Sequence, residues 1–93
     1  MKLPAKYDSL TWQRKREARE TYVKLQNGQC FFCKEELSLP VPDRIKQKEI
    51  NWKLFPEGFL KYPVHLQHNH ETGLTEGAVH NYCNAVMWQY HKK

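Results

Sequence analysis

Four side chains with metal-binding chemistry occur as two pairs, and each pair has two residues between its members. Cys30 and Cys33 form the first pair, and His80 and Cys83 form the second. Two such side chains in one turn can bind one face of a tetrahedral ion, and a second pair then closes the site. Because four protein ligands leave no open position, we predict a structural zinc ion. The alternative is that the cysteines are small buried residues that hold no metal.

A second set of polar residues lies beside the second pair. His68 and His70 precede it, and Asn84 directly follows Cys83. Hydrolysis of a phosphodiester needs a base that activates water and a cation that stabilises the phosphate and the leaving oxygen. A neutral imidazole can act as the base near neutral pH, and a carboxamide oxygen suits a hard ion such as Mg²⁺. This set indicates metal-assisted cleavage with His68 as the base; the alternative is two exposed histidines at a strand end.

The N-terminal third of the chain predicts one helix followed by a tight turn. Residues 1–10 are expected to be a loosely ordered lead-in, and Thr11 can cap a helix that runs to about Gln26. Residues 29–37 then form a turn around the first cysteine pair. One stripe of the helix is apolar (Trp12, Ala18, Tyr22, Leu25), and the opposite face is basic (Arg14, Lys15, Arg16, Arg19, Lys24). The basic face is either a solvated surface or a surface that contacts phosphates.

The remaining elements must bring the second set of polar residues together. Hydrophobic spacing predicts a helix over 43–55, strands over 62–68 and 74–79, and a last helix over 81–91. A strand–turn–strand–helix unit of this kind folds His68 back toward Asn84. Lys92 and Lys93 are expected to form a frayed tail that contacts phosphate.

Length and composition indicate one small basic domain. The chain has 93 residues, a formal net charge of +5 and a pI near 9.2. A core of this size is marginal, so a structural metal is a natural addition, and the positive charge favours a polyanionic partner. Three cysteines cannot all form disulfides, and no apolar run is long enough for a signal peptide or a membrane span. These features favour a reducing intracellular compartment and metal-bound thiolates.

The segment 67–84 resembles the HNH (His-Me finger) nucleases with a ββα-metal fold, above all those of the phage recombination endonuclease VII type. That family reads D-H-D-H-x-T-G, then a glycine, then C-x-x-C-N. This chain reads Q-H-N-H-E-T-G over 67–73, then Gly77, then H-N-Y-C-N over 80–84. The resemblance covers about residues 29–90 and implies a small zinc-stabilised α+β domain over 1–93 with additional helices. Its expected parts are an N-terminal helical segment (1–28), zinc-binding pairs (29–37 and 80–83), a variable insertion (38–63) and a ββα-metal core (64–91).

The resemblance also assigns roles to individual residues. His68 matches the general base, Asn84 matches the metal ligand on the helix, and His70 matches a histidine that contacts the phosphate. Cys30, Cys33, His80 and Cys83 match the structural zinc ligands, with His80 in place of a usual cysteine. Gln67 stands where the family usually has an aspartate ligand. Its neutral oxygen would bind Mg²⁺ more weakly, so activity could be slow or could require Mn²⁺. His65 and His91 match nothing in the family and are expected to be structural or solvated.

These roles imply a metal-dependent DNA endonuclease or nickase with a structural Zn²⁺ and a catalytic Mg²⁺ or Mn²⁺. Its expected partner is DNA, with no membrane association, and homodimerisation is left open. The expected location is the cytoplasm of a bacterial host that carries a phage-encoded protein. Two alternatives compete with this hypothesis. One is a zinc-stabilised DNA-binding module that lost activity through Gln67, and the other is a zinc domain that binds proteins.

Overall fold

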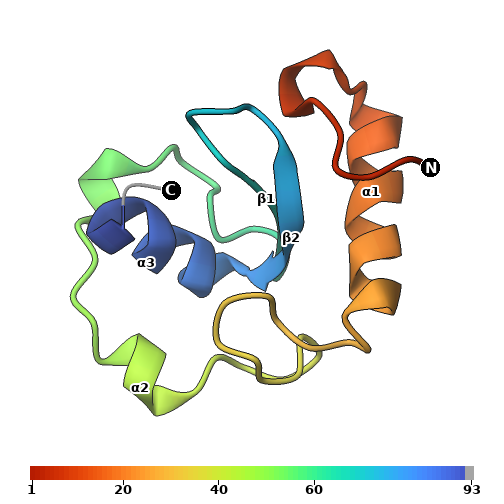
Figure 1. The fold of residues 1–93 in the computed structure, drawn as a ribbon. Helices are drawn as coiled ribbons and strands as arrows, with labels where there is room; N and C mark the ends of the chain where they lie inside the picture. Colours follow the sequence, from red (N-terminus) through yellow and green to blue (C-terminus); the bar gives the residue numbers. More distant parts are fainter. Residues whose placement is uncertain (92–93) are drawn as a thin grey trace.

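A two-stranded antiparallel sheet lies between two helices in the computed structural model, which describes residues 1–91 (Figure 1). This architecture confirms the α+β class, and the expected tail of Lys92 and Lys93 lies outside the described residues. Within residues 1–91, no helix is both long and apolar enough to cross a membrane. The elements are η1 (Tyr7–Ser9), α1 (Trp12–Leu25), α2 (Asp43–Lys46), η2 (Trp52–Leu54), β1 (Val64–His68), β2 (Thr75–His80) and α3 (Asn81–His91).

The two strands form a hairpin that is followed at once by α3. Val64 pairs with His80 at the open end, and the register shifts between Gln67 and His68 near the turn. The Asn69 side chain closes this turn by accepting hydrogen bonds from the amides of Glu71 and Thr72, at 2.8 and 3.1 Å. The strands and the last helix predicted from sequence are confirmed, with α3 found at its predicted bounds.

Helix α1 begins and ends where capping residues predict it. The Thr11 hydroxyl accepts a hydrogen bond from the Arg14 amide at 3.2 Å, and the chain leaves the helix through Asn27 and Gly28, both with positive φ. The predicted apolar stripe is wrong at its two ends. Ala18 is fully buried against the hairpin, whereas Trp12 and Leu25 are 70% and 69% exposed.

The first ten residues are not the loose lead-in that was predicted. The Ala5 amide donates to Thr75 Oγ1 at 2.9 Å, and the Tyr7 amide donates to the Gly73 carbonyl at 2.8 Å. The Thr75 amide donates in return to the Ala5 carbonyl at 2.9 Å. These backbone groups were open to pairing because the hairpin has only two strands. The lead-in therefore docks along the turn and the start of β2.

The predicted helix over 43–55 is also wrong, because only the short α2 and η2 form there. Side chains of α3 form hydrogen bonds with backbone groups that would pair with one another in a continuous helix. The Tyr90 hydroxyl and the Gln89 amide both donate to the Glu49 carbonyl, at 2.6 and 3.0 Å. The Asn51 amide donates to Gln89 Oε1 at 2.9 Å. Tertiary hydrogen bonds thus outcompete the local helical pattern.

At Gly77 the turn after α1 packs closely against β2. A Cβ at this position would lie 2.8 Å from both Gln26 Oε1 and the Phe31 ring. Gln26 fills the space by bonding both backbone groups of Ala78, at 2.9 Å each, and the Phe31 amide donates to the Ala78 carbonyl at 2.9 Å. This contact fastens the first cysteine pair to the strand that leads to the second pair.

Candidate metal centre and histidine groove

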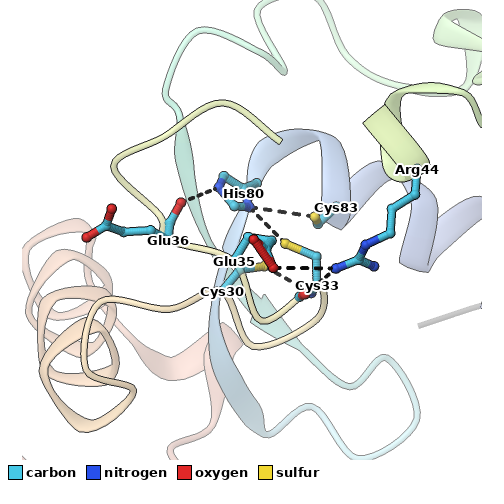
Figure 2. A network of polar contacts seen from close by, with 7 residues as sticks. All are labelled: Cys30, Cys33, Glu35, Glu36, Arg44, His80 and Cys83. Carbon is cyan, nitrogen blue, oxygen red and sulfur yellow. Dashed lines mark hydrogen bonds and ion pairs between the residues drawn. The ribbon is translucent and has the colours of Figure 1, made fainter. Parts of the chain in front are cut away.

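Four metal-binding side chains from two distant parts of the chain meet in the core. Cys30, Cys33, His80 and Cys83 are all buried, and their ligand atoms lie within 4.8 Å of one another (Figure 2). We call this set the Cys/His cluster. Zinc–sulfur bonds of about 2.3 Å in a tetrahedron place sulfur atoms roughly 3.8 Å apart. The cluster therefore has the residue types and the spacing to hold a structural metal such as zinc, as the sequence predicted.

The first pair is held by a tight turn with its own backbone bonds. The Cys30 amide donates to the Glu35 carbonyl at 2.7 Å, and the Lys34 amide donates to the Cys30 carbonyl at 3.0 Å. Lys34 has a φ of 68°, which lets the chain reverse direction after the second cysteine. The Arg44 guanidinium donates to the Cys33 carbonyl at 2.6 Å and ties α2 to this turn (Figure 2).

His80 ends β2 with one ring nitrogen inside the cluster and the other facing backbone oxygens. Its Nε2 donates to the carbonyls of Glu36 and Leu39, each at 3.0 Å, because carbonyl oxygens can only accept. That tautomer leaves a lone pair on Nδ1, which lies 3.4 Å from Cys33 Sγ and 3.7 Å from Cys83 Sγ. Such an outer hydrogen bond is the usual way in which a metal-binding imidazole is oriented.

The thiols of the Cys/His cluster influence one another strongly. A hydrogen bond from the Cys83 side chain lowers the pKa of Cys30 to about 4, and the same bond raises the pKa of Cys83. Burial raises the pKa of Cys33. Several thiolates in so small a volume repel one another, and a divalent cation offsets that repulsion.

A groove of about 560 Å³ runs beside β1, between α1 and α3. It is lined by His65, His68 and His70 from β1 and its turn, and by Asn84 from α3. We call this cavity the histidine groove. Three cations of α1 also line it, together with aromatic residues from the segment before β1 and from α3. The cations are Lys15, Arg16 and Arg19, and these aromatic residues are Phe55, Phe59, Tyr62 and Trp88.

His68 packs against two other rings of the groove lining. It stacks on Tyr7 with ring centroids 3.9 Å apart and an interplanar angle of 12°, and its centroid lies 4.6 Å from that of His70. Lys15 Nζ lies over the Tyr7 ring, 4.2 Å from its centroid. Burial, followed by the charge of His70, lowers the pKa of His68, so the ring is neutral at neutral pH. The predicted base therefore lines the groove in the protonation state that a base needs.

Asn84 lies in the first turn of α3, and its side chain reaches β1. Its Nδ2 lies 3.1 Å from His65 Nδ1, and the Phe59 ring meets the His65 ring edge-on, with centroids 4.7 Å apart. Burial lowers the pKa of His65. His65 was expected to be structural or solvated, and its half-buried side chain, packed on Phe59 beside Asn84, agrees with the structural alternative.

Gln67 is buried, with 1% of its surface exposed. Its Nε2 donates to the His68 carbonyl at 2.9 Å, and its Oε1 has no hydrogen-bond donor among residues 1–91. The described residues that line the groove do not include Gln67. An unpartnered buried oxygen beside His68 fits a cation ligand in its chemistry.

Sequence reasoning missed the contributions of Tyr7, His65 and the segment 52–62 to the groove. Alternation along a strand places Leu66 and His68 on one side of β1 and His65 on the other, so the strand pattern gives no signal that His65 joins them in the groove lining. For Tyr7 no local pattern exists, because its partners lie more than sixty residues away in the chain.

Comparisons with known proteins identify no relative of this chain. Neither the family models, nor the curated proteins, nor the solved structures contain a match.

Proposed function

We propose that this protein is a metal-dependent DNA endonuclease or nickase of the HNH type, which uses the histidine groove as its active site and the Cys/His cluster as a structural zinc site. The observation that carries the proposal is the composition of the groove. Two histidines and an asparagine, drawn from β1, its turn and α3, share one cavity with three cations of α1. A polyanion is the substrate class that such a lining attracts.

The residues that line the groove have separate roles in this proposal. Lys15, Arg16 and Arg19 bind phosphates, although Arg16 also pairs with Glu20 at 3.1 Å. His68 takes a proton from the attacking water, with its ring held by the stack on Tyr7. His70, beside it, contacts the scissile phosphate.

The remaining groups suit a hard divalent cation. Asn84 lines the groove with its carboxamide, and Gln67 Oε1 is a buried oxygen without a donor among residues 1–91. When bound there, Mg²⁺ or Mn²⁺ would supply Lewis-acid stabilisation of the phosphate and of the leaving oxygen. The two oxygens are neutral and should bind the cation weakly. We therefore expect cleavage to need a high concentration of the cation, or to work better with Mn²⁺.

A plasmid assay tests this function. Supercoiled DNA is incubated with zinc-loaded protein and Mg²⁺, Mn²⁺ or EDTA, and nicked and linear products are separated on a gel. We expect cleavage with at least one of the two ions and none with EDTA. His68→Ala should lower the rate by about 10²–10⁴-fold and retain DNA binding and zinc. His91→Ala, which changes a histidine outside the groove lining, is the matched control.

The second candidate function is DNA binding without catalysis. It is favoured by Gln67, because an amide stands where the resembling nucleases usually have an aspartate. Salt-dependent DNA binding without cleavage in any metal would select this candidate. Cleavage that survives unchanged in His68→Ala would overturn the nuclease proposal.

A further inference from the structure

The contact between Asn84 and His65 decides which end of the Asn84 carboxamide faces the groove. The amide nitrogen can only donate and the amide oxygen can only accept. In the observed arrangement Nδ2 lies 3.1 Å from His65 Nδ1, so Nδ2 is the donor and Nδ1 is the acceptor. The oxygen Oδ1 is then the end of the amide that is left for another partner.

The surroundings of His65 favour its role as an acceptor. Its ring meets the Phe59 ring edge-on, with centroids 4.7 Å apart, and burial lowers its pKa, so the imidazole is neutral at neutral pH. A neutral imidazole has one N–H and one nitrogen with a lone pair. Because the Asn84 amide can only donate, Nδ1 is the nitrogen that carries the lone pair.

We propose that His65 is a positioning residue that turns Asn84 Oδ1 toward a divalent cation in the histidine groove. The inference rests on the proposed nuclease function and deepens it. With the opposite rotation of the amide, the N–H groups of Asn84 would face the cation and repel it. His65 thus raises the affinity of the groove for the cation, and it does so through Asn84 without being a ligand.

The effect of losing His65 in two backgrounds distinguishes the positioning role from a purely structural one. Asn84→Asp replaces the amide with a carboxylate, whose two oxygens are equivalent, so rotation no longer matters. Loss of His65 should therefore weaken metal binding in the parent protein and should do little in the Asn84→Asp background. The two effects are compared as a double-mutant cycle, in which the pairwise term is read from the difference.

Mn²⁺ is the probe, and its binding to zinc-loaded protein is followed without DNA by the loss of the free-ion electron paramagnetic resonance signal. The Mn²⁺ concentration for half-maximal plasmid cleavage is the second readout. For His65→Ala we expect about 10–100-fold weaker binding, the usual cost of losing an outer partner of a metal ligand. In the Asn84→Asp background the same substitution should weaken Mn²⁺ binding by less than about threefold, because either carboxylate oxygen can bind the ion.

Two further variants separate the outcomes. His65→Gln keeps a side-chain acceptor and should bind Mn²⁺ more tightly than His65→Ala, and it replaces His65→Ala in the cycle if that variant does not fold. His91→Ala should match the parent protein. Zinc content and the far-ultraviolet circular dichroism spectrum verify the fold of each variant.

Equal losses from His65→Ala in both backgrounds would overturn the inference, and so would no loss in the parent background. If Asn84→Ala leaves Mn²⁺ binding unchanged, the proposed catalytic metal ligand itself is wrong, and the positioning role fails with it. If Asn84→Ala weakens Mn²⁺ binding but His65→Ala does not, only the inference about His65 fails.

Discussion

The Cys/His cluster and the histidine groove meet at Cys83 and Asn84, two consecutive residues of α3, yet they differ in exposure and in the source of their order. The ligands of the cluster are 0–3% exposed and converge on one point. The groove runs along β1, and its residues come from the lead-in, α1, the segment before β1, β1, its turn and α3. One site is a closed set of four ligands, and the other is a surface assembled from six segments.

From this difference we expect the cluster, with its metal bound, to stabilise the fold, and the groove to depend on that fold. A closed set of four ligands leaves no coordination position for a substrate, so its contribution goes to stability. The groove contributes little to the core and needs its supporting elements to be placed first. Because α3 carries one residue of each site in adjacent positions, ordering the cluster also fixes the first turn from which Asn84 projects.

The largest predicted effect follows from disrupting the Cys/His cluster, because loss of the folded state would also remove the histidine groove. Cys83→Ser should abolish stoichiometric zinc and the folded state, because structural zinc binding supplies an apparent 10–16 kcal/mol, about as much as the whole stability of a typical domain. Elemental analysis and a thermal melt measure both. Asn84→Ala, one residue further along, is the control and should keep zinc and fold. A well-folded Cys83→Ser protein without zinc would show that the two sites are independent.

A smaller effect is predicted for the groove alone. Replacing Lys15 and Arg19 by alanine should reduce the salt dependence of DNA binding by about 0.9 per lost phosphate contact on a double-logarithmic plot. The matched control replaces Arg14 and Lys24, which lie on the same helix but do not line the groove. Fluorescence anisotropy with a labelled duplex gives both slopes. Equal reductions in the two variants would mean that overall charge, and not the groove, determines binding.

The smallest effect concerns Gln67, which is as buried as the cluster but lies next to His68, the proposed catalytic base. Gln67→Glu changes charge with almost no change in shape. If Oε1 faces the cation, the Mg²⁺ concentration for half-maximal cleavage should fall by roughly three- to tenfold, because ligand charge tunes affinity. A titration of plasmid cleavage with Mg²⁺ measures this. A lower melting temperature with an unchanged Mg²⁺ requirement would show that this oxygen faces protein, with a buried charge left unpaired.

The cluster was predictable because its information is local. Each ligand pair lies within one turn of backbone, and few residue types bind zinc, so spacing and chemistry together identified all four side chains. Helix α3 was predicted at its observed bounds for a similar reason, since it directly follows the hairpin and continues from the second ligand pair.

The rest was not predictable because its information is spread along the chain. The helix over 43–55 fails because Gln89 and Tyr90 bind the Glu49 carbonyl, a contact across some forty residues. The stack of Tyr7 on His68 and the bond of Asn84 to His65 depend on side-chain directions that no local spacing encodes. The nuclease assignment itself stays a prediction that the plasmid assay must test.

The docking of the lead-in on the hairpin sets an order of events during synthesis. Ala5 bonds to Thr75, a partner 70 residues later in the sequence. At about 5–20 residues per second on the ribosome, that partner is made roughly 3–14 seconds after Ala5. Tyr7 is made a similar time before His68, the ring that stacks on it. The lead-in therefore docks only after the hairpin has emerged, and the histidine groove is completed only then.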